Sequence, residues 1–544
     1  MWTRGSTDGT NRSRMRFRLF GFTLLAAALG AGGWRLPDSS ASRPSVASTR
    51  WLPVAHAQES AARAQVAAPD PPGFATAVGR PVITAPPSIH PVDPYRLAVG
   101  DRVFFPVGQY GGSLTATSRD WDGDIEAMNR AFIETLARYG LNYARAWVNW
   151  GGLPTGRDDW NAHTAQPWVR VAEDSTRSAG GAPATRARAI DGGTRFDLTR
   201  FQDRHFDLIV RALDHARERG IVLQLVIFDC WHLLDRPGGR GDPPAGVAYD
   251  PLHPRNNASG VAVTTPAQWV DPEGPAFEVH ARYVRELVRR VGDRPNLIWE
   301  ACNENSVDPR FDLAVAELLT TTERELGLTP RLVIPRDLPD HRRVAGHFTP
   351  AGDRPHQEER LAEMRRRLVE QREWRQPLIS DNDCCRDRGD PSFRRRKLWT
   401  ALSAGAHVDF FIAGIPHDRA LLESHDVARG MTFFGHLFRF FEGAGVDLLG
   451  MEPCAATGDG WALCRKAGGG DPGSASEWIA YLPHGGRIRL EGLPPERRAC
   501  WFDPRVAAFR PASGGPEYRA PSARDWALHV SSDADAPCRV PREP

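Results

Sequence analysis

The stretch RFQDRHFDLIVRALDHARERGIVLQLVIF, residues 200–228, contains one helix followed by one strand. The apolar residues Phe206, Ile209, Leu213 and Ala216 recur at the 3.6-residue spacing of a helix that packs on a sheet. Gly220 stands where such a helix ends, and the apolar run at 221–228 predicts a buried strand. A helix joined to a buried strand in this way is typical of an α/β fold.

The same alternation extends from residue 95 to about residue 445. We predict eight strands, at 103–107, 142–150, 221–228, 297–302, 331–334, 343–347, 377–380 and 408–412. Helices are predicted at 125–139, 200–219, 278–291, 313–325, 358–372, 392–404 and 427–442. Eight strands alternating with helices predict a (β/α)8 TIM barrel.

Two long insertions interrupt the pattern, at 151–195 after the second strand and at 233–268 after the third. Both follow the carboxyl ends of strands, the face on which barrel proteins build their sites. After Gly450 short strand-like runs lie between Gly and Pro turns without helices, which predicts a small C-terminal β-sandwich. The predicted domains are a signal region at 1–57, an Ala/Pro-rich linker at 58–93, the barrel at 94–448 and the sandwich at 449–544.

The N-terminal residues resemble an export signal. Four arginines between residues 12 and 18 precede the uncharged apolar run at 19–33, which is short for a membrane span. Cleavage is expected after Ala57 or nearer Gly30, and an uncleaved anchor is the alternative. The expected location is the periplasm or the outside of the cell, without stable membrane insertion once the signal is removed.

The chain has 544 residues, and 69 basic against 67 acidic side chains give a net charge of +2. This balance gives no support for nucleic acid as a partner. The eight cysteines predict two disulfides, Cys454–Cys464 and Cys500–Cys538, while Cys230, Cys302, Cys384 and Cys385 are expected to be buried thiols. Their spacing fits no zinc site, so we predict no metal and no cofactor. No oligomeric state is predicted.

The segment Ile298-Trp299-Glu300-Ala301-Cys302-Asn303-Glu304 holds the strongest candidate site. It is an apolar strand that ends in Asn-Glu at the fourth position of the barrel. Glycoside hydrolysis needs one carboxylic acid to protonate the leaving oxygen and a second carboxylate across the sugar. A neighbouring amide can hold the sugar 2-hydroxyl. The alternative is a structural carboxylate at a strand end.

This segment resembles the fourth strand of the clan A glycoside hydrolases, the cellulase-like barrels. The resemblance implies that Glu304 is the acid/base and that Asn303 contacts the 2-hydroxyl. The run NYARAW at 142–147 resembles the second strand of that clan, and Arg145 matches the arginine that supports the nucleophile.

Further residues match the clan near the sugar. FDCWH at 228–232 resembles the end of the third strand, which implies substrate contacts for Asp229, Trp231 and His232. His347, in VAGHF at 344–348, resembles the histidine of the sixth strand, although a core histidine is the alternative. Indole faces suit sugar rings, so Trp150 is a further candidate, with Trp147 also at a strand end and Trp299 assigned to the core.

A narrower resemblance rests on FFPVG at 104–108, HPRNN at 253–257 and PLISDND at 377–383. These runs look like DUF4038-type bacterial barrel glycosidases, several of which carry a C-terminal sandwich named for collagen binding. YLPHGG at 481–486 and WFDPR at 501–505 resemble that sandwich.

The seventh strand departs from the clan, whose nucleophile there is Glu. This chain has Asp381 and Asp383, which period-two alternation places on one face, with Asn382 on the other. An Asp carboxylate reaches roughly 1.5 Å less than that of Glu. One Asp acts as the nucleophile of a retaining enzyme, or the carboxyl pair stands wider as in inverting enzymes, or the site is inactive.

We expect a secreted or periplasmic glycoside hydrolase that acts on a poly- or oligosaccharide, with retention ranked first. The alternative is a non-catalytic carbohydrate-binding or adhesion protein on a degenerate barrel. The arginine-rich runs at 365–367 and 394–397 are expected to be solvated helix faces rather than a binding patch.

Overall fold

The computed structural model describes residues 83–148, 152–153, 162–172, 188–233, 246–305, 307–334, 349–351, 361–382, 390–410, 415–466, 475–493, 495–533 and 538–539. For residues 349–351, 381, 382 and 409 it describes the main chain. All of these residues lie within one unit, Gln65–Pro544. None of the described helices is long and apolar enough to cross a membrane.

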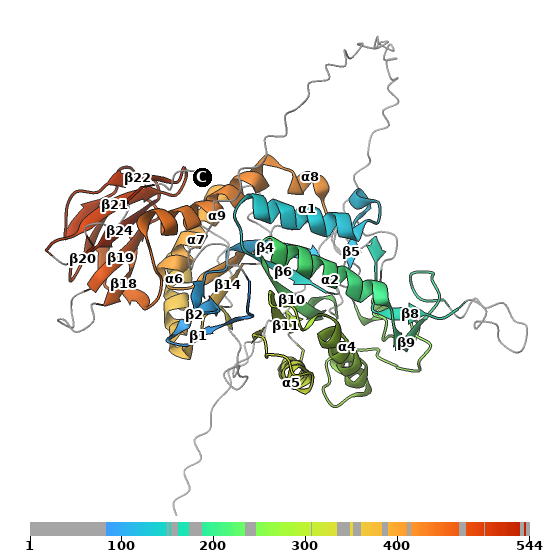
Figure 1. Ribbon diagram of the computed structural model, residues 1–544. Helices are drawn as coiled ribbons and strands as arrows, with labels where there is room; N and C mark the ends of the chain where they lie inside the picture. The colour runs from blue at the N-terminus through green and yellow to red at the C-terminus, as the bar shows by residue number, and fades with distance from the viewer. Residues whose placement is uncertain are drawn as a thin grey trace, which may run out of the picture. The chain divides into compact units, whose positions relative to one another are not determined.

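Parallel strands form two sheets, and within each sheet neighbouring strands follow the order of the sequence. Five form one sheet: β4 (Gly108–Ser113), β6 (Tyr143–Trp147), β10 (Val222–Asp229), β11 (Leu297–Asn303) and β12 (Val333–Ile334). Three form another: β13 (Thr349–Ala351), β14 (Leu378–Asn382) and β15 (His407–Phe410). Figure 1 labels β4, β6, β10 and β11 of the first sheet and β14 of the second. A bridge between Val107 and Val408 links the β15 edge to the β4 edge. No pairing within the described residues joins β12 to β13, so the structure does not show a closed barrel.

Helices follow most of the described parallel strands and pack on their neighbours, as Figure 1 shows for α1, α2 and α4. Their bounds are α1 Ile125–Arg138, α2 Asp203–Glu218, α4 Pro275–Val291, α5 Pro309–Glu325, α6 Leu361–Glu370, α7 Pro391–Ser403 and α9 His425–Ala444. All seven predicted helices are present with ends shifted by a few residues. In α2, Phe206, Ile209, Leu213 and Ala216 are buried, and Gly220 follows with φ +67°. A left-handed residue at this position favours glycine and ends the helix.

The first barrel strand is not where we predicted it. Residues 102–104 form β3 (Arg102–Phe104) in an antiparallel sheet with β1 (Pro87–His90) and β2 (Asp93–Val99), and the first parallel strand is β4. Pro106 cannot donate to a strand ladder, which separates the two elements. The predicted sixth strand at 343–347 lies outside the described residues, and β13 pairs with β14 in its place.

The two insertions carry short elements of their own. β5 (Ala116–Thr117) pairs with β7 (His163–Thr164), and β8 (Trp168–Arg170) pairs with β9 (Phe196–Phe201). The second insertion reaches α3 (Pro266–Trp269), and α8 (Arg419–Leu422) precedes α9. Asn257 Nδ2 donates to three carbonyl oxygens at 3.0–3.1 Å, which gives this residue a structural role in the insertion.

The C-terminal region is rich in sheet. Six antiparallel strands follow the order β16 (Met451–Cys454), β18 (Trp461–Lys466), β19 (Ala475–Leu482), β24 (Trp526–Ser531), β21 (Arg498–Asp503) and β22 (Ala508–Pro511). A second sheet holds β17 (Ala456–Gly458), β20 (Arg487–Leu490) and β23 (Glu517–Arg519). Trp478, Ile488 and Tyr518 come from both sheets and belong to one buried cluster.

Helix α7 is covered by the C-terminal sheet, which corrects our expectation for residues 394–397. Arg394, Arg395 and Lys397 are buried rather than solvated. The Arg395 guanidinium donates to both carboxylate oxygens of Asp525 at 2.8 and 2.9 Å. The indole of Trp399 stacks on the Tyr481 ring at 5.7 Å between centroids. By contrast, Arg366 and Arg367 are exposed, as predicted, and each pairs with Glu363. Arg365, which we had also expected to be solvated, is half-buried, with its guanidinium carbon 5.8 Å from the centroid of the Trp461 ring.

The cysteine predictions have mixed outcomes. Cys500 and Cys538 form the expected disulfide. Cys454 and Cys464 are thiols and do not form the disulfide that we expected. Cys230 forms a disulfide with Cys302, although we had expected both to be buried thiols. The Cys230–Cys302 bond joins the carboxyl ends of two neighbouring strands. The two cysteines are 72 residues apart in sequence, so their spacing did not predict that they would pair. Cys384 and Cys385 lie outside the described residues.

Candidate active site

The candidate site lies at the carboxyl ends of β10 and β11. These strands pair in parallel with Asp229 directly opposite Asn303, so two predicted site residues are brought together by register. Asn303 Nδ2 donates to Asp229 Oδ1 at 2.9 Å. The Cys230–Cys302 disulfide crosses between the same two strands beside this hydrogen bond. The relative position of the two strand ends is therefore held covalently as well as by the sheet.

A buried ion pair between Arg145 and Glu300 lies next to Asn303. Arg145 Nε donates to Glu300 Oε2 at 2.6 Å, and Arg145 Nη2 contacts Glu300 Oε1. Gln224 Nε2 also donates to Glu300 Oε2 at 2.6 Å, and the Tyr143 hydroxyl donates to Gln224 Oε1. All four side chains are at most 2% exposed. A buried carboxylate requires such partners, because desolvation without them would favour its neutral form.

The amide of Asn303 is oriented from two sides. Its Oδ1 accepts from Arg145 Nη2 at 2.8 Å, while its Nδ2 donates to Asp229. Because the arginine can only donate and the carboxylate oxygen accepts, the two ends of the amide are distinguished chemically. An amide nitrogen carries two N–H bonds, and Asp229 accepts from one of them.

Glu304 follows at the end of the strand. It is half-buried and has φ +48°, in the left-handed region that non-glycine residues rarely adopt. Asn305 then donates to Asp308 O at 2.7 Å and to Asp312 Oδ2 at 2.5 Å, which fixes the turn into α5. A strained residue that is held in place by its surroundings is common at functional sites.

Asp229 is almost fully buried, with 3% of its surface exposed. Burial raises the pKa of its carboxyl group, against the lowering effects of His232, Asn303 and Arg145. Its Oδ2 atom is buried and makes no hydrogen bond. Asp229 therefore supports the Asn303 amide through its Oδ1 atom, and the substrate contact that the resemblance implies for it stays a prediction.

His232 is held by the second insertion. Its Nε2 lies 3.2 Å from Asp250 Oδ2, its Nδ1 contacts Asp229 O, and both side chains are buried. Burial alone would lower the pKa of His232, but the hydrogen bond and charge of Asp250 outweigh it, so the net pKa is raised. Burial alone would raise the pKa of Asp250, but the hydrogen bond and charge of His232 outweigh burial, so the net pKa of Asp250 is lowered.

The His232–Asp250 pair predicts a pH-dependent stability. Because the folded pKa of His232 lies above its ordinary 6.5, the pair stabilises the protein fully below about pH 6.5 and loses this contribution as pH rises through the folded pKa. The contribution of Asp250 is lost only in acid, below its ordinary 3.8. Urea unfolding should be measured at pH 5.5 and at pH 8.5. The free energy of unfolding should differ more between wild type and Asp250→Asn at pH 5.5 than at pH 8.5. The exposed control Glu273→Gln should show no such change. If Asp250→Asn lowers the free energy of unfolding equally at both pH values, the His232–Asp250 pair does not cause the pH dependence.

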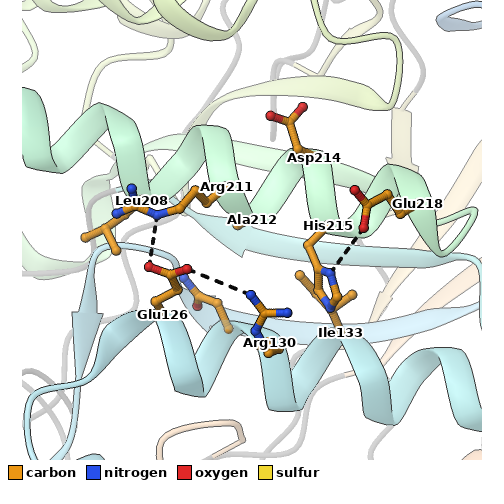
Figure 2. Close-up of a pocket in the computed structure, with 10 residues that line it drawn as sticks. Glu126, Arg130, Ile133, Leu208, Arg211, Ala212, Asp214, His215 and Glu218 are labelled. Carbon is orange, nitrogen blue, oxygen red and sulfur yellow. Dashed lines mark ion pairs between the residues drawn. The ribbon is translucent and has the colours of Figure 1, made fainter.

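The described residues offer one group of metal-ligand type, Cys500, His529 and Cys538 in the C-terminal region. Its two sulfurs are bonded to each other, so the group is not available to a metal in this state. A groove of about 190 Å³ lies between α1 and α2. It is lined by Glu126, Arg130, Arg211, His215 and Glu218 (Figure 2). Its charges are paired within the groove, with Arg211 Nε 3.0 Å from Glu126 Oε2. The groove belongs to the outer helical layer and not to the strand ends.

Two solved structures share the fold over most of their lengths. A glycoside hydrolase family 5 protein from Bacteroides vulgatus has a TM-score of 0.53 at 13% identity, covering 84% of this chain and 96% of its own. A second structure, a glycoside hydrolase, has a TM-score of 0.52 at 12% identity, covering 83% of this chain and 98% of its own. The chain has the fold of a glycoside hydrolase. This likeness implies a TIM barrel. No family model and no curated protein sequence matches the chain.

The structure brings together five of the predicted site residues: Arg145, Asp229, His232, Asn303 and Glu304. Trp231 lies half-buried beside them in the 3-10 turn Cys230–Leu233. The main chain places Asp381 near the carboxyl end of β14, opposite Asp409 of β15. Trp150, His347 and Asp383 lie outside the described residues.

Two tryptophans at the strands are core residues. Trp299 is buried, as predicted, and its Nε1 donates to Glu323 Oε1 at 2.8 Å. Trp147 is 3% exposed and lies against the Arg145 guanidinium, so it is not a platform for sugar. Sequence reasoning missed Glu300, Gln224 and Asp250. A charged Glu300 in the middle of an apolar strand, beside an arginine in another strand, is the signal that could have found the buried pair.

Proposed function

We propose that the protein is a glycoside hydrolase with Glu304 as its acid/base. The observation that carries the proposal is the Asn303–Glu304 pair at the carboxyl end of β11, with the Asn303 amide oriented by Arg145 and Asp229. The carboxyl ends of barrel strands are where barrel enzymes hold their catalytic groups. The shared fold with two glycoside hydrolases supports the same activity.

In the proposed mechanism the anomeric configuration is retained. Asp381 attacks the anomeric carbon, the glycosidic bond breaks, and Glu304 gives its proton to the departing oxygen. Glu304 then takes a proton from water, which attacks the same carbon and releases Asp381. Asn303 donates to the 2-hydroxyl, a contact that strengthens as positive charge develops on the sugar. Asp383 is the second candidate for the nucleophile.

Further features belong to this proposal. We propose that the eight strands close into a (β/α)8 barrel and that the two C-terminal sheets form a β-sandwich related to that of DUF4038-type glycosidases. The basic and apolar N-terminal run supports export to the periplasm or beyond. Carbohydrate is the proposed partner, and His232, Trp231, Trp150 and His347 are proposed to border the sugar. The chemistry needs no cofactor.

The function is tested by incubating the protein with a panel of neutral polysaccharides and aryl glycosides. Reducing ends should appear with at least one glycan, and NMR should show that the first anomer formed has the configuration of the substrate. Glu304→Gln and Asp381→Asn should remove this activity. If wild type and both variants are equally inert yet bind a glycan, the protein is a carbohydrate-binding protein and the proposal is wrong.

A further inference from the structure

We propose that Glu300 is a positioning residue that sets the orientation of the Asn303 amide through Arg145. The inference rests on the proposed function, because it concerns the 2-hydroxyl contact made by Asn303. Glu300 is fully buried, three residues before Asn303 on β11. It acts on the site through its partner and not by touching the substrate.

The connection runs through one nitrogen atom. Arg145 Nη2 contacts Glu300 Oε1 and also donates to Asn303 Oδ1 at 2.8 Å. The second contact, from Arg145 Nε to Glu300 Oε2 at 2.6 Å, makes the pair bidentate and fixes the plane of the guanidinium. The direction in which Nη2 points at Asn303 is therefore determined by the carboxylate of Glu300.

The surroundings leave this guanidinium little freedom. Its central carbon lies 4.7 Å from the centroid of the Tyr110 ring and 4.8 Å from that of Trp147. Glu300 is itself held by Gln224, whose Nε2 donates to Oε2 at 2.6 Å. Several ring and hydrogen-bond contacts thus converge on a single charged donor that faces the amide oxygen of Asn303.

The contact with Arg145 determines which end of the Asn303 amide, the NH2 group or the oxygen, faces the sugar. With Arg145 on Oδ1 and Asp229 on Nδ2, the amide is held with its NH2 group toward the β10 side. If Arg145 is released, the amide can rotate by half a turn and offer an acceptor where the sugar 2-hydroxyl expects a donor. Because the 2-hydroxyl contact strengthens in the transition state, the loss should lower kcat rather than raise KM.

The test compares Glu300→Gln with the wild type on two substrates. One is a dinitrophenyl glycoside of the sugar that the enzyme hydrolyses, and the other is its 2-deoxy analogue. Glu300→Gln should lower kcat on the first by up to about 10²-fold, the scale of a misplaced catalytic contact. On the 2-deoxy analogue, which lacks the 2-hydroxyl, Glu300→Gln should have the same kcat as the wild type. Equal losses on both substrates would mean a general structural role and would overturn the proposal.

A matched control uses another buried carboxylate behind the same strand. Glu323 accepts from Trp299 Nε1 and from the Arg331 N–H, at 2.8 and 3.0 Å, so its described hydrogen bonds lie apart from Arg145 and Asn303. Glu323→Gln should leave the ratio of kcat on the two substrates unchanged. If Glu300→Gln does not fold, the double variant Arg145→Met/Glu300→Leu removes both charges, which buried pairs often tolerate. It should show the same substrate-dependent loss.

A second readout does not require activity. In protein labelled with ¹⁵N at asparagine, the side-chain NH2 signals of Asn303 are identified by their loss in Asn303→Ala. Glu300→Gln should shift these signals and speed their exchange with solvent, whereas Glu323→Gln should not. Unchanged Asn303 signals in Glu300→Gln would overturn the positioning role. If the wild type hydrolyses no glycoside, the proposed function fails, while the NMR result still decides the role of Glu300.

Discussion

Glu304→Gln should lower kcat on an unactivated glycan by about 10²–10⁴-fold, the contribution of a positioned general acid. The substitution keeps the size and most hydrogen bonds of the side chain but removes the proton that the leaving oxygen needs. KM should change little, because the lost interaction exists only in the transition state. Glu317→Gln, which alters an exposed carboxylate on α5, is the matched control and should retain full activity.

The leaving group separates an acid/base from a residue that merely supports the fold. A dinitrophenolate leaves without protonation, so Glu304→Ala should still form the glycosyl-enzyme from a dinitrophenyl glycoside. It should then stall, since no base activates water. Azide, a nucleophile that needs no base, should restore turnover and produce a glycosyl azide. If the activity of Glu304→Ala is lost equally with good and poor leaving groups and azide has no effect, Glu304 is not the acid/base.

Asp525→Ala should lower the free energy of unfolding by about 3–5 kcal/mol, the cost of leaving one partner of a buried ion pair uncompensated. Arg395 and Asp525 are 3% and 2% exposed, and they make two hydrogen bonds between α7 and the start of β24. The Tyr481 hydroxyl, 3.4 Å from Asp525 Oδ2, adds a third contact to the same carboxylate. Urea or thermal unfolding followed by circular dichroism measures the loss.

The control for this prediction is an exposed pair in the same region. Arg487 Nη1 lies 3.2 Å from Glu517 Oε1, and both side chains are more than half exposed. Glu517→Ala should therefore cost no more than about 1 kcal/mol. Because Tyr481 and Phe502 share one buried cluster with residues of α7 and α9, wild type should unfold in a single transition. Equal losses for Asp525→Ala and Glu517→Ala would contradict the account.

Much of the fold could be predicted because its signals are local. The helix at 203–218 is visible in apolar spacing and in the glycine that follows it. The strands β10 and β11 are visible as apolar runs, and the parallel order of strands brings Asp229 opposite Asn303 without further information. The candidate site could be predicted for the same reason, since polar residues at the ends of neighbouring strands must lie together.

The features that escaped prediction depend on contacts between distant parts of the chain. Arg395 has the pattern of a solvated helix face, and only the docking of the C-terminal sheet buries it. Cys230 and Cys302 are brought together by strand register, not by spacing. Asp250 reaches His232 from within a long insertion, where no periodicity indicates a direction. Pro106 marked the break between β3 and β4, but the apolar run around it resembled one continuous strand.

The most direct test of the central claim is covalent trapping of the enzyme with a 2-deoxy-2-fluoro glycosyl fluoride of the sugar that it hydrolyses. Fluorine slows both steps, and the good leaving group lets the glycosyl-enzyme accumulate. Intact-mass spectrometry should show one added glycosyl group, and peptide mapping should place it on Asp381. Asp381→Asn should acquire none. Turnover of the glycan without any adduct, or an adduct on a residue outside β14 and the segment that follows it, would contradict the proposed mechanism.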